Sequence, residues 1–186
     1  MSRKAPLKAV FFDRDGVLNL DHGYVCEPER LDWIEGAREA VARLNAADVK
    51  VLVVTNQSGV ARGYFTEAQV DRFHAALQAG LAEVGGRIDA FYVAPHHEDA
   101  VDERYRHPDH PDRKPNPGMI LRGLSEWALA AEETVLVGDK GSDVEAAGRA
   151  GVEGLRFPGG DLLAFLRQSL GERFPATGLG GGARDR

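Results

Sequence analysis

Several features are scarce in this chain of 186 residues, and each scarcity argues against a class of protein. The single cysteine, Cys26, has no partner for a disulfide within the chain, which excludes a disulfide-stapled domain. No apolar run approaches the ~20 residues that span a bilayer, and no signal-peptide stretch follows the basic start, Met1 to Pro6. Basic residues (23) are fewer than acidic ones (29), and the net charge of −6 argues against nucleic-acid binding. We therefore expect a cytoplasmic monomer that binds neither membranes nor nucleic acid.

The rest of the composition, with 43% hydrophobic and 28% charged residues, is typical of one globular domain. Apolar runs alternate with segments of helical period, and two capping boxes, at 66–69 and 142–145, are predicted to open helices. Strands are predicted at 9–12, 49–54, 89–93, 134–137 and 152–157, and helices at 35–47, 66–84, 119–129, 142–150 and 162–166. This alternation predicts an α/β fold, a Rossmann-like three-layer sandwich around a central parallel sheet. We assign 1–170 to a single domain and expect 171–186 to be a flexible tail.

Two aspartates, Asp13 and Asp15, directly follow the first apolar strand and precede Gly16. Charge at this position lies at the carboxyl end of a strand, where open α/β sheets bind their ligands. Two neighbouring carboxylates repel each other unless a cation or a proton lies between them. The pattern therefore indicates a metal site or an acid/base pair, although the segment 13–16 would also serve as a polar turn.

Three further segments carry polar side chains at or near the ends of predicted elements. Thr55 follows the second strand, Lys114 precedes a helix within a proline-rich turn, and Asp139 follows the fourth strand. Parallel strands bring their carboxyl ends to one edge of the sheet, so these side chains should converge with Asp13 and Asp15. Each motif alone is weak, but their occurrence together in this order is a strong signal of one site.

These motifs resemble those of the haloacid dehalogenase-like phosphohydrolases, and most closely those of the heptose bisphosphate phosphatases and the related histidinol-phosphatase domains. The matching segments are Phe12-Asp-Arg-Asp-Gly-Val-Leu-Asn19, Asp21-His-Gly-Tyr-Val25, Val54-Thr-Asn-Gln-Ser-Gly-Val-Ala-Arg-Gly63, Arg113-Lys-Pro-Asn-Pro-Gly-Met119 and Val137-Gly-Asp-Lys140. The resemblance covers about 9–157, which is most of the chain. It implies a phosphatase that acts on a small phosphorylated sugar.

The resemblance also implies roles for the acidic residues, which their spacing alone does not fix. Asp13 would be the nucleophile that forms an aspartyl-phosphate, and Asp15 would protonate the leaving oxygen and later deprotonate water. Asp13, Asp139 and the Asp15 carbonyl would bind a hard cation, and their oxygen ligands together with a phosphate point to Mg²⁺. The residues that would hold the equatorial phosphate oxygens are Thr55, Asn56 and Lys114.

The remaining predicted site residues are expected to bind substrate. They are Asn19, Asp21, His22, Asn56, Gln57, Ser58, Arg62, Arg113 and Lys140. Each has an alternative role: 21–23 as a plain turn, Arg62 and Arg113 as rim residues, and Lys140 as a solvated surface lysine. Asp143 is either part of the acidic site or a first-turn charge favoured by the helix dipole.

The spacing of the motifs indicates an open site. About forty residues separate Asp15 from Thr55, which leaves no room for a large cap domain.

The resembled family carries a zinc loop before its Arg-Lys-Pro motif, but the corresponding positions here are Ala94, His96, His110 and Asp112. Histidine and aspartate at three of these positions leave an N/O zinc site conceivable. We favour a loop without zinc, held by prolines, ion pairs and backbone hydrogen bonds.

The hypothesis from sequence is a Mg²⁺-dependent phosphatase that removes the 7-phosphate of D-glycero-D-manno-heptose 1,7-bisphosphate, a step toward nucleotide-activated heptose for lipopolysaccharide or other glycans. Histidinol phosphate or another small sugar phosphate is the alternative substrate. A phosphotransferase or phosphomutase is the alternative enzyme, although it would need to keep water from its aspartyl-phosphate. A non-catalytic binding protein is the third alternative.

Overall fold

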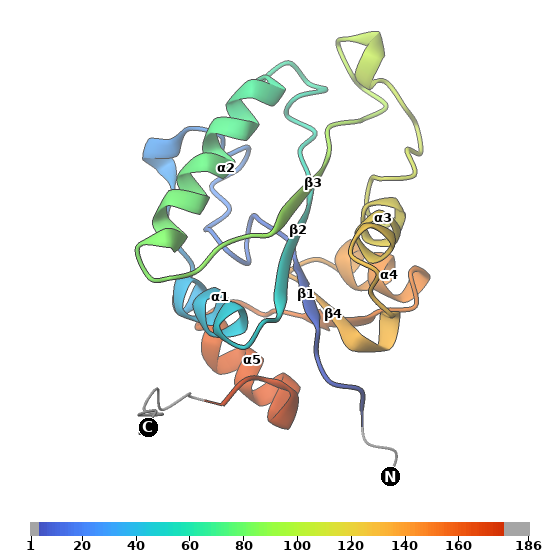
Figure 1. Ribbon diagram of the computed structural model, residues 1–186. Helices are drawn as coiled ribbons and strands as arrows, with labels where there is room; N and C mark the ends of the chain where they lie inside the picture. Colours follow the sequence, from blue (N-terminus) through green and yellow to red (C-terminus); the bar gives the residue numbers. More distant parts are fainter. Residues whose placement is uncertain (1–3, 177–186) are drawn as a thin grey trace, which may run out of the picture.

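Five parallel strands form the central sheet of the structure, a computed structural model that describes residues 4–176 (Figure 1). The strands are β1 Ala9–Phe12, β2 Lys50–Asn56, β3 Ala90–Ala94, β4 Thr134–Gly138 and β5 Glu153–Arg156. Their order is β3-β2-β1-β4-β5, so the first strand lies at the centre. Phe12 pairs with Val53 of β2 and with Val137 of β4, so the carboxyl ends of three strands meet at one edge of the sheet. The predicted parallel sheet is confirmed.

The side chains of β1 alternate between two apolar cores, one on each face of the sheet. Val10 and Phe12 belong to the larger core, whereas Ala9 and Phe11 belong to the smaller one. All four are fully buried, as expected for a strand that helices cover on both faces. This burial fixes the direction in which the chain leaves β1, and the residues that follow, from Asp13 onward, are the acidic ones.

Helices cover both faces of the sheet, which gives the predicted three layers (Figure 1). On one face lie α1 (Ala37–Ala46), α2 (Glu67–Ala82) and α5 (Leu162–Leu170), and on the other lie α3 (Gly118–Glu126) and α4 (Gly141–Arg149). Single 3₁₀ turns occur at Pro28–Arg30, Glu103–Tyr105, Ala131–Glu133 and Gly171–Arg173. No cap domain is inserted among the described residues, and the long connections 13–36 and 95–117 are largely irregular.

Of the two predicted capping boxes, the first is confirmed and the second is wrong. The Thr66 side chain accepts a hydrogen bond from the Gln69 backbone N–H, and the Gln69 side chain accepts one from the Thr66 backbone N–H, so α2 begins as predicted. Helix α4 instead begins one residue earlier than expected, with Lys140 as its N-cap. The Asp143 carboxylate accepts the Lys140 backbone N–H at 2.9 Å, whereas the prediction paired Ser142 with Glu145 at the helix start.

The domain continues beyond the predicted boundary at residue 170. Gly171–Arg173 forms a 3₁₀ turn, and Phe174 is only 5% exposed within the larger core. The prediction placed this apolar side chain in the tail because glycines follow it closely in sequence. The rest of the expected tail, 177–186, lies outside the described residues. Within 4–176, no helix combines the length and apolarity needed to cross a membrane.

Candidate active site

A cavity of about 450 Å³ opens at the carboxyl edge of the sheet. Asp13 directly follows β1, and Asn56 and Gln57 lie at the end of β2, so strand register alone brings them to this edge. The predicted site residues that line the cavity are Asp13, Asp15, Asp21, Asn56, Gln57, Ser58, Arg113, Lys114 and Lys140. The convergence expected from the strand ends is therefore present.

Lys114 is a buried cation that lines the cavity, and its ammonium contacts three acceptors. Nζ lies 2.8 Å from Asp13 Oδ1 and 2.7 Å from Asp143 Oδ1, and it donates to the Val54 carbonyl at 2.8 Å. Burial alone would lower the pKa of Lys114, but the two carboxylates outweigh burial and raise it. Lys114 therefore stays protonated, with its charge divided between two aspartates.

Asp13 is left with incomplete charge compensation. Burial raises the pKa of its carboxyl from 3.8 to about 6, with a further contribution from Asp143, while Lys114 opposes the increase. Both hydrogen bonds that described residues donate to the Asp13 carboxylate fall on Oδ1, one from Lys114 Nζ and one from the Arg14 backbone N–H at 2.8 Å. Oδ2 is therefore the oxygen left for a reaction partner.

Three carboxylates, those of Asp13, Asp139 and Asp143, form the candidate metal centre. Each offers one oxygen, and these oxygens lie within 4.8 Å of one another. Asp139 Oδ1 is buried and has no hydrogen-bond partner, and burial raises the pKa of the Asp139 carboxyl. A hard divalent cation such as Mg²⁺ prefers oxygen ligands and would satisfy this orphaned atom, so the residues present fit the ion.

Two glycines make room for these carboxylates. Gly16 has φ +84°, and a Cβ there would lie 2.5 Å from Asp139 Oδ2. At Gly138 a Cβ would clash with the Asp143 side chain. Because any larger side chain would displace an acidic group, the turn after β1 and the last position of β4 both require glycine.

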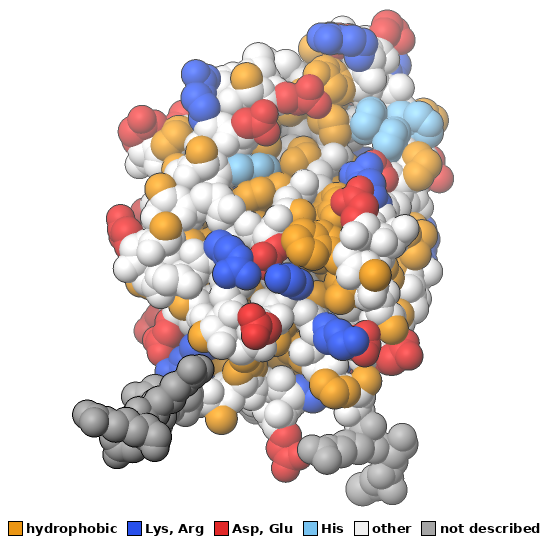
Figure 2. Space-filling model, in the orientation of Figure 1, with side chains coloured by type: hydrophobic (Ala, Val, Ile, Leu, Met, Phe, Trp, Pro, Cys, Tyr) orange, Lys and Arg blue, Asp and Glu red, His pale blue; other side chains and the backbone are white. Residues whose placement is uncertain are grey.

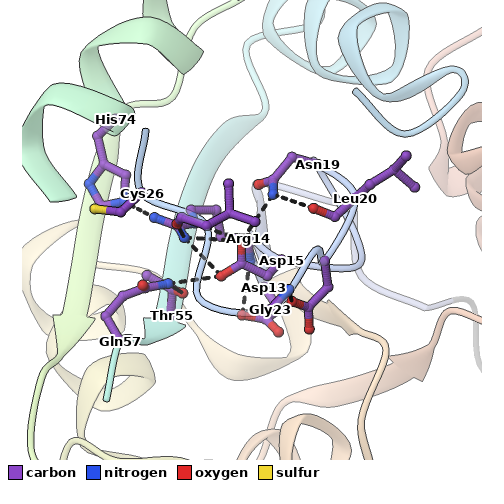
Figure 3. Close-up of polar contacts among 12 residues, drawn as sticks. Asp13, Arg14, Asp15, Asn19, Leu20, Gly23, Cys26, Thr55, Gln57 and His74 are labelled. Atoms are coloured by element: carbon purple, nitrogen blue, oxygen red, sulfur yellow. Dashed lines mark hydrogen bonds and ion pairs between the residues drawn. The ribbon is translucent and has the colours of Figure 1, made fainter. Parts of the chain in front are cut away.

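Asp15 is held by three side chains that together occupy both of its oxygens (Figure 3). Arg14 donates to Oδ1 and Oδ2 at 2.9 to 3.1 Å, Asn19 Nδ2 donates to Oδ1 at 2.9 Å, and Gln57 Nε2 donates to Oδ2 at 2.9 Å. The same Gln57 amide donates to Thr55 Oγ1 at 2.9 Å. Asp15 is therefore fixed beside Asp13, with its orientation set by neighbours rather than by solvent.

Five predicted site residues do not line the cavity, and one of them, Asp139, belongs to the acidic centre described above. Asn19 and Thr55 are fully or almost fully buried, and they hold Asp15 and Gln57 rather than facing the cavity. His22 points to Asp32, with 2.6 Å between Nε2 and Oδ2. Arg62 contacts His97 Nε2 at 3.1 Å. In the structure the buried Asn19 amide thus serves the Asp15 carboxylate, which needs hydrogen-bond donors where it is shielded from water.

Two cavity-lining pairs combine the predicted residues in ways that sequence spacing did not indicate. Asn56 exchanges two hydrogen bonds of 3.0 Å with the Lys114 backbone, so β2 positions the buried lysine. Lys140 Nζ lies 3.3 Å from Asp21 Oδ2. Burial works against the charge of Lys140, but Asp139 and Asp21 together raise its pKa. Lys140 is thus a half-exposed cation at the edge of the cavity.

Arg113 and Arg62 form a basic pair near the rim. The Arg113 guanidinium lines the cavity and donates to the His96 carbonyl at 3.2 Å. Burial and the neighbouring Arg62 lower the pKa of Arg113, while Tyr24 and Glu98 oppose this effect. Two adjacent cations outside the acidic centre give the cavity a second anion-attracting region.

Sequence reasoning missed three residues of the site. Asp143, which it left as either an acidic ligand or a first-turn charge, is 1% exposed and belongs to the acidic centre. Arg14 is fully buried although it lies between two aspartates, and His74, on α2, contacts it. A sequence signal existed only for Asp143, through its position five residues after the end of β4. Nothing in the sequence indicated that the Arg14 side chain turns inward.

The loop that replaces the zinc loop of the resembled family contains four histidines, and Figure 2 shows histidines gathered near the upper right of the molecule. His96 stacks on His110 with 3.5 Å between ring centroids, and the Asp112 carboxylate pairs with Arg122. Within 4–176, the acidic centre is the one group of three residues whose ligand atoms lie close enough to hold a metal. Ion pairs such as Arg104–Asp102 and Arg106–Glu103 stabilise the loop, together with backbone hydrogen bonds.

Comparison with known proteins adds four findings. The sequence pattern of the haloacid dehalogenase-like hydrolases matches residues 21–151. The D-glycero-beta-D-manno-heptose-1,7-bisphosphate 7-phosphatase of Rhodopseudomonas palustris is 44% identical over 172 residues, which are 91% of this chain and 94% of that protein. The protein of the same name from Escherichia coli K12 is 39% identical over 152 residues, which are 82% and 78% of the two chains. The crystal structure of D,D-heptose 1,7-bisphosphate phosphatase from B. bronchiseptica, complexed with magnesium and phosphate, superposes with a TM-score of 0.74 at 33% identity, covering 87% of each chain.

Proposed function

Because this chain belongs to the haloacid dehalogenase-like hydrolases and is a phosphatase, we propose that it removes the 7-phosphate of D-glycero-β-D-manno-heptose 1,7-bisphosphate. The observation that carries the proposal is the Asp13 carboxylate, held by Lys114 at the floor of an open cavity beside two further carboxylates. The substrate is the one named for the relatives, and a second basic region near the cavity suits a molecule with two phosphates.

Asp13 is the proposed nucleophile. Its Oδ2 attacks phosphorus, the bond from phosphorus to the sugar oxygen breaks, and an aspartyl-phosphate forms. Oδ1 keeps its hydrogen bonds to Lys114 and to the Arg14 backbone, which fixes the carboxylate for in-line attack. A water molecule then attacks phosphorus, which releases phosphate and restores Asp13.

Asp15 is the proposed acid and base. It donates a proton to the leaving sugar oxygen in the first step and takes one from the attacking water in the second. Its position beside Asp13 and on the cavity wall suits both transfers. The hydrogen bonds from Arg14, Asn19 and Gln57 fix the orientation of this carboxyl.

Mg²⁺ is the proposed cofactor, held by Asp13, Asp139 and Asp143, with the Asp15 backbone carbonyl as a further ligand. When bound, it would offset the repulsion between the carboxylates and the phosphate. Lys114, Asn56 and Ser58 are the proposed contacts to the oxygens of the transferred phosphate, because they line the cavity around Asp13. Asp21, Gln57 and Lys140 line the same cavity and are proposed to contact the sugar.

Arg113, with Arg62 behind it, is the proposed binding site for the phosphate that is not cleaved. The cavity has no cap domain over it among the described residues, so a sugar bisphosphate has room and water has access to the aspartyl-phosphate. Access of water favours hydrolysis over transfer of the phosphoryl group.

The test is release of inorganic phosphate with and without Mg²⁺. The substrates are heptose 1,7-bisphosphate in both anomers, fructose 1,6-bisphosphate, histidinol phosphate and an aryl phosphate, with Asp13→Asn as the inactive control. We expect kcat/KM for the β-heptose bisphosphate to exceed the other values at least tenfold. A preference for histidinol phosphate, or a flat profile, would overturn the substrate, and activity in Asp13→Asn would overturn the nucleophile.

The loop 94–112 is proposed to contain no zinc, since its Asp112 carboxylate pairs with Arg122 and position 94 is an alanine. Elemental analysis of protein purified without chelator should find far less than one zinc per chain. A stoichiometric zinc that survives dialysis would contradict this proposal.

A further inference from the structure

We propose that His74 positions the Asp15 carboxyl for proton transfer by holding Arg14, an inference that rests on the proposed phosphatase chemistry. Neither His74 nor Arg14 lines the cavity, so both act through Asp15 rather than on the substrate. They are positioning residues, and Asp15 is the catalytic residue that they serve.

Arg14 is a fully buried cation whose guanidinium contacts hydrogen-bond acceptors and an aromatic ring. Its guanidinium donates to both oxygens of Asp15, and Nη2 also donates to the Val25 carbonyl at 2.7 Å. The guanidinium carbon lies 4.5 Å from the centre of the Phe73 ring. Burying a charge costs free energy unless hydrogen-bond partners of good geometry surround it. These contacts therefore favour one orientation of the Arg14 guanidinium.

His74 supplies the contact on the remaining side. Its Nε2 lies 3.4 Å from Arg14 Nη1, and Figure 3 shows the imidazole facing the guanidinium from α2. Arginine only donates hydrogen bonds, so His74 must accept here, with its proton on Nδ1. Burial and the adjacent Arg14 lower the pKa of His74 to about 3, which agrees with a neutral acceptor.

The orientation of the imidazole is itself fixed. The His74 ring stacks on Phe91 of β3, with 4.1 Å between centroids and 10° between planes. His74 is 5% exposed. A chain of contacts therefore runs from β3 through the ring to Arg14 and then to Asp15. Rotation of the guanidinium would break its two-oxygen contact with Asp15, and a small displacement of an acid/base group lowers the rate strongly.

The experiment compares leaving groups, because loss of a positioned acid and general loss of structure affect them differently. A sugar alkoxide must be protonated as it leaves, whereas 4-nitrophenolate leaves without a proton. The variant His74→Phe keeps a ring against Phe91 but removes the acceptor, and His74→Gln restores an acceptor at similar reach. Gln78→Leu is the matched control, because Gln78 lies one turn further along α2 and makes two hydrogen bonds to Ile88 outside the site.

In wild type, Mg²⁺-dependent turnover of both the heptose bisphosphate and 4-nitrophenyl phosphate is measured first. We then expect His74→Phe to lower kcat/KM for the sugar phosphate at least tenfold, with less than a threefold change for the aryl phosphate. His74→Gln should recover most of this loss. Gln78→Leu should lower Tm without changing the ratio of the two rates.

Equal losses on both substrates, or no loss on either, would overturn the role of His74 while leaving the proposed function intact. Absence of activity in wild type would overturn the proposed function and this inference with it. If His74→Phe does not fold, His74→Asn, whose amide stops short of Arg14, allows the same comparison of leaving groups.

Discussion

At the residue scale, the site is defined by one ammonium that serves two buried carboxylates. Lys114 contacts Asp13 and Asp143, and Asp139 adds a third carboxylate whose Oδ1 has no partner. Negative charge exceeds positive charge at this acidic centre, and the excess raises the proton affinity of its carboxylates when no metal is bound. The same excess makes the centre receptive to a cation.

The first prediction concerns the pH dependence of stability in metal-free protein. The pKa of Asp13 is about 6 in the folded chain, against 3.8 when exposed, so between these values the folded state retains a proton that the unfolded state has lost. Stability from this group therefore falls as pH rises through that window, by up to about 3 kcal/mol. Wild type should lose stability relative to Asp13→Asn between pH 4 and 7 in EDTA, as measured by urea unfolding. A constant difference across this range would contradict the assignment.

The second prediction concerns the buried ammonium. Lys114→Met leaves the Asp13 and Asp143 carboxylates facing each other without compensation, so the free energy of unfolding should fall by about 3–5 kcal/mol and activity by more than 100-fold. Excess Mg²⁺ should restore part of the loss in Tm. The same substitution at Lys140, whose side chain is 56% exposed, should cost less than about 1 kcal/mol. Equal destabilisation by both variants would count against a special role for Lys114.

At the scale of elements, the strand ends carry the chemistry and the turns after them decide its geometry. The turn after β1 brings Gly16 against Asp139 from the turn after β4, so two segments distant in sequence share one small space. Helix α4 contributes Asp143 from its first turn, where the same carboxylate also accepts the Lys140 backbone N–H. The acidic centre therefore depends on close packing between two loops.

The third prediction tests this packing. Gly16→Ala places a methyl group 2.5 Å from Asp139 Oδ2, so Asp139 must move and the Mg²⁺ concentration for half-maximal activity should rise at least tenfold. Gly85 has a similar positive φ but nothing within 4 Å of its Cβ position. Gly85→Ala should therefore reproduce the backbone strain, about 1 kcal/mol, without changing the Mg²⁺ requirement. Similar Mg²⁺ titrations for both variants would refute the argument.

Elements were largely predictable from sequence, whereas side-chain directions in the loops were not. Strand β1 and the Thr66 cap follow from local patterns, which the structure satisfies directly. The Ser142 cap failed because α4 begins at Gly141, which places Ser142 inside the first turn, where Asp143 accepts the Lys140 backbone N–H. Asn19 and Arg14 lie in a turn, which lacks the hydrophobic periodicity that shows which side chains of a helix or strand point inward. Their burial depends on partners from distant segments, such as His74.

At the scale of the whole molecule, an acidic protein must bind an anionic substrate. The net charge of −6 opposes approach of the proposed bisphosphate substrate, and Figure 2 shows acidic and basic side chains interspersed over the visible face. The cavity counters this with Arg113, Lys114 and Lys140 on its walls. Binding should therefore depend on a few local cations rather than on the overall field.

The fourth prediction follows from that local compensation. Arg113→Gln should raise KM for heptose 1,7-bisphosphate about tenfold or more, the effect of losing a hydrogen bond to a charged group. KM for heptose 7-phosphate, which lacks the second phosphate, should change less than threefold. Arg122→Gln removes a cation that pairs with Asp112 outside the cavity, and should leave both values unchanged. Equal increases for both substrates in Arg113→Gln would place Arg113 at the transferred phosphate instead.

The central place of β1 has a consequence for synthesis of the protein. Of the five strands, β1 leaves the ribosome first, but its second neighbour, β4, follows only after about 120 further residues. During that interval one edge of an entirely apolar strand has no native partner, which invites pairing with other nascent chains. Substitutions that delay the docking of β4 should therefore reduce the yield of native protein in cells while leaving the specific activity of the purified enzyme unchanged.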